Sequence, residues 1–414
     1  MFNELLFKIK KRKATVLVIG LGYVGLPLLN LISSKNYLTS GLDLNKSKIL
    51  DLKKKFKKIK FYNNYNLIDF NLFDIIIIAL PTPIKKNKDP DLSYVDNCIK
   101  KLVKKIKTSK LIVLESTTYP STTNNYIVKP FSKKFEIGKN FFVGYSPERE
   151  DPGNKKFSIK NINKITSGFS KKCSQLTFSF YKEVCNSVIR SSSIEIAETT
   201  KIFENIFRSV NIGLVNEMKQ ICKKNNIDIN EVVNLAKTKP FGFMPFYPGP
   251  GVGGPCIPVD PFYLSWLAKK KMVNTKFIYL AGKINSDMPK IISQEINNYL
   301  KKNKINNPKI LLLGVAYKKN IDDQRNSPSI NIFKNLIKFQ IKVDYNDKFI
   351  KKIKINQKNF NSIKLNKKNI SNYDAILLAT NHDYYNKELI YSNAKLIFDT
   401  RNFFEDYKNK VIKL

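Results

Sequence analysis

Histidine is nearly absent from this chain of 414 residues, in which His382 is the only one. A single histidine argues against a Ser-His-Asp triad and against a zinc site built from His and Cys, and we expect no metal. Any general acid or base must then be Lys, Asp, Glu or Tyr, acting directly or through water.

Cysteine is scarce as well. The five cysteines stand at positions 98, 173, 185, 222 and 256 without a C-x-x-C pair, and an odd number argues against a full disulfide framework. No apolar run approaches the roughly 20 residues of a membrane span. The opening "MFNELLFKIKKRK" lacks the pattern of a secretory signal. We therefore predict a cytoplasmic protein of enzyme size with no membrane partner.

Acidic residues are few beside basic ones: 33 Asp and Glu against 73 Lys and Arg give a net charge of +40. A positive field attracts phosphate, so nucleic acid, an acidic membrane or a nucleotide would each suit it. No DNA- or RNA-binding motif accompanies the charge, and lysine is spread along the whole chain. We interpret the excess as a compositional bias and expect no nucleic-acid partner.

Short apolar runs typical of buried parallel strands recur along the first part of the chain. They lie at 14–19, 40–45, 74–80, 110–116 and 141–146, with helix-like segments such as 93–107 between them. From about 193 a helical pattern of roughly 30 residues follows, and a second runs from about 275 to 303. Strands and helices alternate again from 309.

This order predicts an α/β fold with two Rossmann-like doubly wound domains joined by a central domain of long helices. The predicted domains are 1–190, 191–303 and 304–414. Long central helices of this kind often pair subunits, so we expect a homodimer.

A glycine fingerprint, G-x-G-x-x-G, follows the first strand. Its members are Gly20, Gly22, Tyr23, Val24 and Gly25. The glycines allow a tight turn and the close approach of a pyrophosphate to the N-terminus of the next helix. Asp43, 18 residues after Gly25, can accept from both hydroxyls of an adenine ribose and would repel a 2′-phosphate. The motif favours NAD over NADP; the alternative is a tight turn that binds nothing.

Two loops follow later strands, "PTP" at 81–83 and "STTYP" at 116–120. Ligands of open α/β sheets bind outside the carboxyl ends of the strands. Pro81, Thr82 and Thr117 are therefore expected to flank the nicotinamide. The alternative is a pair of ordinary turns.

Three polar residues share one face of the long helical pattern, because Lys201, Asn205 and Arg208 are spaced by four and three. Taken alone, this spacing also describes a solvated polar stripe.

The segment "GPGVGGPCIPVDP" at 249–261 surrounds Cys256 with glycine. Gly251 and its neighbours permit positive φ and close backbone approach. Asp260 is expected to cap the following helix, with Pro261 at its first position. A thiol just before a helix N-terminus can have a depressed pKa and act as a nucleophile; the alternative is a small buried apolar residue.

A basic segment, "GVAYKKNIDDQRNSPSI" at 314–330, follows the first strand of the last domain. Lys318 and Arg325 are candidate partners of a phosphate. The alternative is that they belong to the general lysine excess.

In combination these motifs resemble the UDP-glucose dehydrogenase superfamily of UDP-sugar 6-dehydrogenases, most closely its UDP-N-acetyl-hexosamine branch. The segments "GLGYVGLPL", "PTP…DPDLSYV", "LESTTYPSTT", "GYSPEREDPGN", "GPGVGGPCIPVDPFYL" and "GVAYKKNIDDQRNSPS" occur in the family's order between 14 and 401. Pro255 departs from the pattern, since this branch usually has His before the cysteine.

The resemblance implies an NAD-dependent four-electron oxidation of the carbon-six alcohol of a UDP-sugar, for surface-polysaccharide precursors. Cys256 would capture the aldehyde as a thiohemiacetal that becomes a thioester, and Lys201 and Asn205 would hold the developing oxyanion. Thr117, Glu148 and Asp260 match positions that orient or activate water. The implied substrate contacts are Glu148, Arg149, Lys201, Asn205, Arg208, Tyr247, Gly251, Lys318 and Arg401, and Arg325 would reach the cofactor.

Two other functions remain open from the sequence. One is a UDP-glucose 6-dehydrogenase, because the motifs report loop shape and not the acetyl group. The other is a non-catalytic nucleotide-binding protein of the same fold, against which the intact set of Cys256, Lys201 and Asn205 argues.

Overall fold

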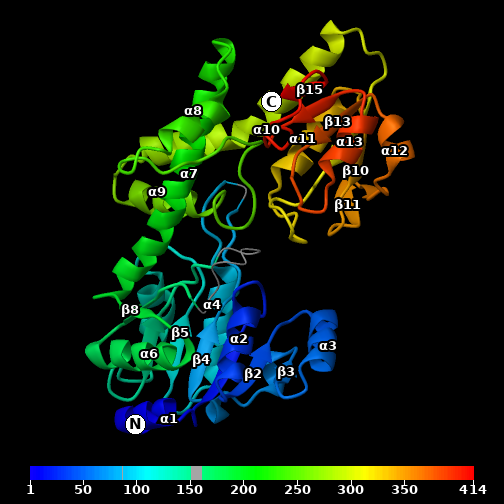
Figure 1. Ribbon diagram of the computed structural model, residues 1–414. Coiled ribbons are helices and arrows are strands. Elements are labelled where there is room, and N and C mark those ends of the chain that lie inside the picture. The colour runs from blue at the N-terminus through cyan, green and yellow to red at the C-terminus, as the bar shows by residue number, and fades with distance from the viewer. Residues whose placement is uncertain (86, 151–160) are drawn as a thin grey trace. The chain divides into compact units, whose positions relative to one another are not determined.

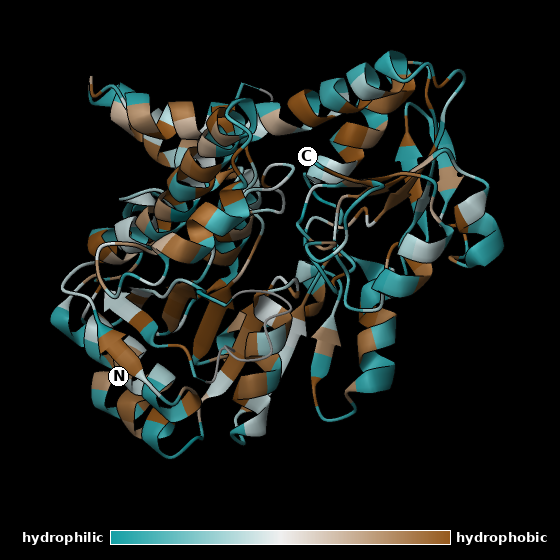
Figure 2. Cartoon of the chain, turned by 45° about the horizontal axis from the view of Figure 1, so that its top comes forward, coloured by the Kyte–Doolittle hydropathy of each residue, from teal (hydrophilic) through white to brown (hydrophobic). Residues whose placement is uncertain are grey.

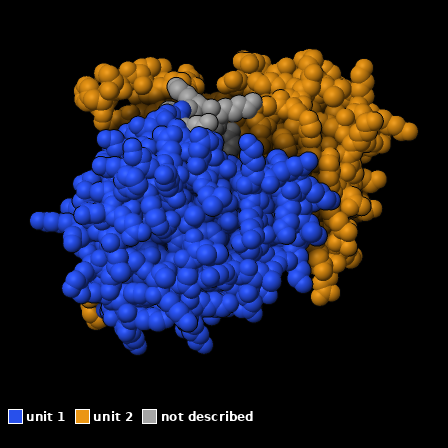
Figure 3. Space-filling model, turned by 90° about the horizontal axis from the view of Figure 1, so that it is seen from below, with its two compact units in different colours: residues 1–204, 262–270 blue, residues 205–261, 271–414 orange. Residues whose placement is uncertain are grey.

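The computed structural model describes residues 1–85, 87–150 and 161–414 (Figure 1). The chain divides into two compact units, shown in different colours in Figure 3. Unit 1 comprises residues 1–204 and 262–270, and unit 2 comprises residues 205–261 and 271–414. The two units are defined by how the residues pack together. The predicted domain boundaries at 190 and 303 depend on changes in the sequence pattern, and they remain predictions.

Unit 1 is built on an eight-stranded sheet. In sheet order its strands are β3 (Lys60–Tyr62), β2 (Leu38–Leu42), β1 (Thr15–Ile19), β4 (Ile75–Ile78), β5 (Leu111–Leu114), β6 (Phe142–Tyr145), β7 (Lys164–Gly168) and β8 (Val188–Arg190). All neighbours are parallel except β6 and β7. The order reverses between β1 and β4, which makes their carboxyl ends the topological switch point where such sheets bind ligands.

Helices cover both faces of this sheet because alternate residues of each strand point to opposite sides. Val16 and Val18 face one hydrophobic cluster, and Leu17 and Ile19 face the other. The first cluster includes residues of α1 (Phe2–Lys10), α2 (Gly25–Ser34), α3 (Lys46–Lys55) and α6 (Lys171–Val184). The second includes residues of α4 (Ser93–Lys105), η3 (Asn124–Val128), α5 (Lys129–Ser132) and the start of α7 (Ile194–Lys224).

Unit 2 contains a smaller, all-parallel sheet. Its order is β10 (Lys342–Asn346), β9 (Lys309–Leu313), β13 (Ala375–Leu378), β14 (Ile397–Asp399) and β15 (Val411–Lys413). One face packs against α10 (Lys276–Lys302) and α11 (Pro328–Lys338), and the other against α12 (Lys367–Ser371) and α13 (Lys387–Asn393). A separate antiparallel hairpin joins β11 (Lys352–Ile355) to β12 (Lys358–Asn361).

The long helices agree with the sequence prediction. Helix α7 has 31 residues, belonging to unit 1 up to Glu204 and to unit 2 from Asn205, and α10 retains Pro289 in its interior. Shorter elements are α8 (Ile229–Ala236), α9 (Asp260–Lys270), η1 (Tyr65–Leu67) and η2 (Phe70–Leu72). The predicted class, two Rossmann-like α/β parts with long helices, is confirmed.

Hydrophobic residues are concentrated on the strands, while most helices carry hydrophobic and hydrophilic residues together (Figure 2). Strand β4 is four isoleucines in a row, all buried, as expected of a central parallel strand covered on both faces. Across the described parts of the chain, no helix has the length and apolar character needed to span a membrane.

Candidate functional site

The glycine fingerprint of unit 1 forms a tight turn between β1 and α2. Gly20 has φ of +91°, and a Cβ there would lie 2.4 Å from the carbonyl oxygen of Ala79. A Cβ on Gly25 would lie 1.8 Å from the oxygen of Gly20, so this glycine lets α2 pack against the turn. A Cβ on Gly22 would meet nothing within 4 Å. The open space beside Gly22, next to a helix N-terminus, fits the approach of a pyrophosphate.

Asp43 lies at the end of β2 against this turn. Its Oδ2 accepts from the backbone N–H of Leu21 at 3.1 Å, and its Oδ1 accepts from that of Asn45 at 3.0 Å. The ammonium of Lys48 lies 3.3 Å from Oδ2. The carboxylate side chain remains 20 % exposed, so it can receive ribose hydroxyls. Tyr23, within the turn, is largely exposed.

The two predicted loops at the switch point are joined to each other. The hydroxyl of Thr82 donates to the carbonyl of Thr117 at 2.7 Å, and Ser116 donates to the carbonyl of Leu80 at 2.8 Å. Tyr263 of α9 donates to the carbonyl of Thr82. Residues following β4 and β5 therefore form one surface, on which Pro81 is exposed.

Glu148, after β6, has both carboxylate oxygens occupied. Oε1 accepts from the backbone N–H groups of Arg149 at 2.8 Å and Glu150 at 2.7 Å. Oε2 accepts from the ammonium of Lys164 at 2.9 Å. The same ammonium lies 2.6 Å from Oε2 of Glu115, the residue directly after β5. The site therefore contains a buried triad of one lysine and two carboxylates.

The triad sets the ionisation of its members. Burial alone would raise the pKa of Glu148, but the charge of Lys164 and three hydrogen bonds outweigh it and hold this pKa below its usual value. Burial raises the pKa of Glu115 to about 6, although Lys164 opposes the shift. Burial would lower the pKa of Lys164, but the two carboxylates raise it above its ordinary value.

The side chain of Arg149 is bonded to other residues of the same chain. Its guanidinium donates from Nε to Glu204 at 3.2 Å, its Nη2 lies 2.5 Å from the same carboxylate, and its Nη1 donates to the carbonyl of Asn163 at 2.9 Å. This predicted substrate contact therefore ties the loop after β6 to α7. Residues 151–154 of the same sequence motif lie outside the described residues.

Lys201 lies on the part of α7 that belongs to unit 1, and it is only 8 % exposed. One turn earlier, Glu198 accepts from the backbone N–H groups of Ser121 at 2.7 Å and Thr123 at 2.8 Å, and from the Thr123 hydroxyl. Burial raises the pKa of Glu198 to about 7, although the hydrogen bonds oppose the shift. These contacts fix the start of α7 against the segment after β5.

In unit 2, Asn205 and Asp260 are brought together, and the amide of Asn205 donates to Oδ2 of Asp260. Helix α9 begins at Asp260 itself, one residue earlier than predicted. The carbonyl of Cys256 accepts from the N–H groups of Val259 at 2.9 Å and Asp260 at 2.8 Å. Cys256 is partly exposed, whereas the other four cysteines are buried. Cys256 is thus the one cysteine of the chain that is not buried, and it precedes a helix N-terminus.

The glycines before Cys256 serve close packing within unit 2. A Cβ on Gly253 would lie 2.6 Å from Cβ of Tyr317, and one on Gly254 would lie 2.7 Å from the Tyr317 ring. Gly254 also donates its N–H to the carbonyl of Arg325 at 2.9 Å. The sequence predicts close backbone approach at these glycines, and the structure shows them packing the cysteine segment against the segment that carries Lys318 and Arg325.

The predicted basic residues of unit 2 differ in their surroundings. Arg325 forms a two-pronged ion pair with Asp323, with Nη2 2.7 Å from Oδ2. Arg401 donates from Nε to the carbonyl of Ala379 at 2.9 Å, and a Cβ on Gly249 would lie 2.7 Å from its Nη1. Burial lowers the pKa of Arg401 to about 10, so it remains a cation at neutral pH.

A chain of asparagines anchors the cysteine segment to α7 and α10. Gly249 donates its N–H to Oδ1 of Asn216 at 3.0 Å, and Asn216 donates to Oδ1 of Asn285 at 3.1 Å. Pro289 has no N–H for the carbonyl of Asn285 four residues earlier. A Cβ on Gly251, which has φ of +110°, would lie 2.7 Å from that carbonyl.

Two predicted substrate contacts are not gathered with these residues. Arg208 is exposed on α7. The Tyr247 hydroxyl donates to Oδ1 of Asn234 at 2.9 Å, and the ring is half exposed.

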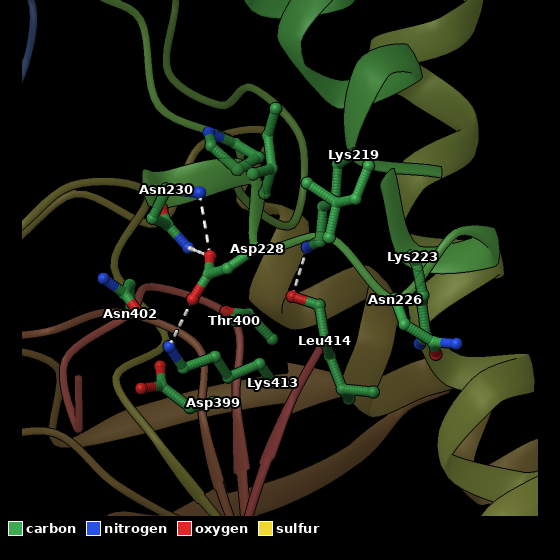
Figure 4. A pocket seen from close by; sticks show the side chains of 13 residues that line it. Lys219, Lys223, Asn226, Asp228, Asn230, Asp399, Thr400, Asn402, Lys413 and Leu414 are labelled. Atoms are coloured by element: carbon green, nitrogen blue, oxygen red, sulfur yellow. Dashed lines mark hydrogen bonds and ion pairs between the residues drawn. The ribbon is translucent and has the colours of Figure 1, made fainter. Parts of the chain in front are cut away.

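Sequence reasoning missed a cavity of about 330 Å³ in unit 2 (Figure 4). It is lined by Lys219, Lys223, Asn226, Ile227, Asp228, Ile229, Asn230, Pro248, Asp399, Thr400, Asn402, Lys413 and Leu414. Lys219 donates to the backbone of Leu414, and Lys413 pairs with Asp228 at 2.7 Å. None of the predicted site residues lines it. Among the described residues, no cluster of three or more His, Cys, Asp or Glu could hold a metal ion.

Three domain profiles of the UDP-glucose/GDP-mannose dehydrogenase family match the chain. The NAD binding domain matches residues 57–185, the central domain 195–287 and the UDP binding domain 311–406. The glycine fingerprint and Asp43 precede the first matched range, so the assignment of this domain does not depend on them.

Similar proteins cover nearly the whole chain. A UDP-N-acetyl-D-glucosamine 6-dehydrogenase from Pseudomonas aeruginosa is 33% identical over 387 residues, 89% of this chain and 90% of that protein. A UDP-N-acetyl-D-mannosamine dehydrogenase from Methanococcus maripaludis is 31% identical, covering 94% of this chain and 93% of its own. The solved structure of a UDP-D-ManNAc dehydrogenase from Pyrococcus horikoshii matches with a TM-score of 0.83 and 28% identity, covering 94% of this chain and 95% of that one.

Proposed function

Because this chain belongs to the UDP-glucose/GDP-mannose dehydrogenase family, we propose that it oxidises carbon six of a UDP-N-acetyl-hexosamine to the carboxylate with two NAD+. It is an NAD-dependent oxidoreductase with the family's NAD binding, central and UDP binding domains. The observation that carries the proposal is the partly exposed Cys256, whose segment packs against the segment that bears Lys318 and Arg325.

Unit 1 provides the groups for the dinucleotide. The open space at Gly22 suits the pyrophosphate, and the partly exposed carboxylate of Asp43 suits the adenine ribose. The joined loops that carry Pro81, Thr82 and Thr117 would flank the nicotinamide at the switch point. NAD+ supplies the electron acceptor for each of the two oxidations.

Cys256 would hold the sugar between the oxidations. Its sulfur adds to the aldehyde to form a thiohemiacetal, whose oxidation gives a thioester, and water then cleaves the C–S bond to release the carboxylate. The whole reaction consumes one alcohol, two NAD+ and one water, and yields the carboxylate, two NADH and three protons. A covalent hold keeps the aldehyde in place while the cofactor is exchanged.

Lys201 and Asn205 would stabilise negative charge on the oxygen at carbon six. They are one helical turn apart on α7 and both are buried, so their donors act in a medium of low dielectric constant. Asn205 is oriented by Asp260. Glu148, with Thr117 and Asp260, is assigned to the water that cleaves the thioester.

The remaining predicted residues would hold the nucleotide sugar. Arg401 stays cationic and Lys318 lies on the segment packed against the cysteine, which suits a diphosphate. Arg325 is proposed to exchange its Asp323 partner for the cofactor. The exposed Arg208 and Tyr247 and the Gly251 backbone remain predicted contacts.

The N-acetyl-hexosamine class is supported by relatives named for UDP-N-acetyl-glucosamine and UDP-N-acetyl-mannosamine. A role in surface-polysaccharide synthesis and a cytoplasmic location stay predictions of the sequence.

We also propose a homodimer formed through α7. Four large apolar side chains are exposed at helical spacing on its unit 2 part: Phe207, Leu214, Met218 and Ile221. Such a stripe, on the surface of a helix, is typical of a protein interface.

The test is a panel of UDP-sugars with NADH formation as the readout. We expect turnover with a UDP-N-acetyl-hexosamine and about two NADH for each sugar; one NADH for each sugar, or turnover of UDP-glucose alone, would contradict the proposal. Cys256→Ala should stop steady-state NADH formation. Cys98→Ala, which removes a thiol on the buried face of α4, is the matched control and should retain turnover.

A further inference from the structure

Three members of the buried cluster around Glu148 have no role so far: Lys164, Glu115 and Tyr181. They come from the start of β7, the end of β5 and α6, and each is at most 3 % exposed. The Tyr181 hydroxyl donates to Oε1 of Glu115, and Oε2 of Glu115 lies 2.6 Å from the Lys164 ammonium. The cluster therefore runs as one chain of contacts from Tyr181 through Glu115 and Lys164 to Glu148.

Counting lone pairs identifies the reactive atom of Glu148. A carboxylate oxygen can accept about two hydrogen bonds. Oε1 already accepts two, from the backbone N–H groups of Arg149 and Glu150. Among the described residues, Oε2 accepts one hydrogen bond, from Lys164, and so has one acceptor position left.

We propose that Lys164, held in turn by Glu115 and Tyr181, is the positioning residue of thioester hydrolysis, fixing Glu148 so that Oε2 receives the proton of the attacking water. This inference rests on the proposed function, because it assigns a device to the water step of that reaction. Lys164 acts through Glu148 and is not itself a catalytic residue.

The step balances without any further reagent. The water oxygen forms a bond to the thioester carbon, and one proton of the water passes to Oε2 of Glu148. The C–S bond breaks, and Cys256 leaves as a thiolate that is protonated in turn. No group is oxidised or reduced.

The groups that face Glu148 explain why it stays ionised. Lys164 is the only cation in contact with its carboxylate among the described residues, since the adjacent Arg149 pairs with Glu204. Glu115 from β5, and Tyr181 and Cys185 from α6 and its C-terminal end, lie around Lys164. Glu115 places a second negative charge near Glu148, which opposes its ionisation, and Lys164 lies between the two carboxylates.

This arrangement predicts opposite effects for two substitutions. The readout is thioester decay in a single turnover, followed by acid quench and intact-protein mass spectrometry across a pH series. Lys164→Met removes the cation, which should raise the pKa of Glu148. Glu148 should then become protonated at a higher pH, so the acid limb of the plot of decay rate against pH should move to higher pH. Glu115→Gln removes the neighbouring negative charge, which should lower the pKa of Glu148. The acid limb should therefore move to lower pH. A lower decay rate without a shift of the acid limb, or shifts of the limb in the same direction in both variants, would overturn the proposal.

Two further variants separate positioning from structural damage. Lys164→Arg retains the cation and should leave the limb close to that of the wild type. Lys110→Met removes another buried lysine, at the opposite end of β5, whose ammonium donates to the Phe73 carbonyl at 2.7 Å. It should leave the limb unchanged. If Lys164→Met does not fold, the neutral pair Glu115→Gln/Lys164→Met takes its place, with the limb again expected above wild type.

Glu148→Gln distinguishes failure of this inference from failure of the proposed function. Loss of a general base should slow thioester decay by about 10²–10⁴-fold, while NADH still forms in the first turnover. Normal decay in Glu148→Gln would remove Glu148 from the water step and the inference with it. The thioester of Glu148→Gln could decay slowly while Lys164→Met keeps the acid limb of the wild type. That result would leave the proposed function intact and refute the positioning role of Lys164.

Discussion

The amide of Asn205 donates a hydrogen bond to the carboxylate of Asp260, and both side chains are almost completely buried. The two residues are 55 positions apart in the sequence. Their contact joins α7 to the first residue of α9, four residues after Cys256. In the proposed reaction it fixes the direction in which Asn205 presents its amide.

Asn205→Ala should destabilise the protein by about 1–3 kcal/mol, because it removes a hydrogen bond to a buried carboxylate. Asn205→Asp places a second carboxylate against Asp260, so one of the two should stay protonated and activity should depend on pH over a new range. Denaturant unfolding and kcat against pH measure the two effects.

Asn211→Ala is the control for this pair, because Asn211 lies six residues further along α7 and donates to the backbone carbonyl of Phe207. It should change stability by less than about 0.5 kcal/mol. Equal losses in the Asn205 and Asn211 variants would contradict the importance of the Asp260 contact.

Asp43→Ala should raise KM for NAD+ by about tenfold or more, since a hydrogen bond to a charged group contributes about 1.5–3 kcal/mol. It should also relax the rejection of NADP+, because Lys48, now 3.3 Å from Asp43, would face a 2′-phosphate without a competing anion. Initial rates with both cofactors measure this, with the exposed Asp51→Ala on α3 as control. An unchanged preference would remove Asp43 from the cofactor site.

The class of fold was predictable because its signals are local. Strand β4 is an uninterrupted apolar run, and α7 is a periodic helix without proline. The hairpin of β11 and β12 was missed because its strands have four residues each and alternate with lysine and asparagine. Such short polar strands are fixed by their pairing and not by their composition.

The candidate site could be predicted where a short local motif indicates its chemical role, as at Cys256 and the glycine fingerprint. The sequence could not show that Tyr317 fills the space beside Gly253 and Gly254, since that contact joins segments about 60 residues apart. Lys164 was missed for the same reason. Its one signal is a lysine at the edge of a buried strand, which becomes informative only when Glu115 and Glu148 are seen beside it.

Lys164→Met should destabilise the protein by about 3–5 kcal/mol, because two buried carboxylates lose the cation that they share. Adding Glu115→Gln should restore part of this loss, since a neutral pair needs no compensation. Fluorescence of Trp266, the only tryptophan, reports unfolding of unit 1, where it packs against Tyr119. A double variant less stable than Lys164→Met would be contrary to this account.

Lys110 should make stability depend on alkaline pH. The residue is 1 % exposed, and burial lowers its pKa to about 8, with Asp74 opposing the shift. In the unfolded chain its pKa returns to 10.5. Between pH 8 and 10.5 the unfolded chain therefore binds more protons, and this residue's contribution to stability should increase as pH rises.

The measurement compares wild type with Lys110→Met, whose stability lacks this contribution. The difference in unfolding free energy should grow in favour of wild type across that window by an amount on the order of 3 kcal/mol. A difference that stays constant with pH would show that Lys110 keeps an ordinary pKa.

The proposed dimer makes a prediction for the apolar stripe on α7. Leu214 is 58 % exposed and lies between Phe207 and Ile221 on the same face. Leu214→Asp would bury an unpaired charge in the interface, so the dimer should dissociate while the monomer remains folded. Leu67→Asp, on η1 and 64 % exposed, introduces the same charge outside the stripe and should remain dimeric. Sedimentation velocity gives both masses, and a wild-type chain that sediments as a monomer at micromolar concentration would refute the interface.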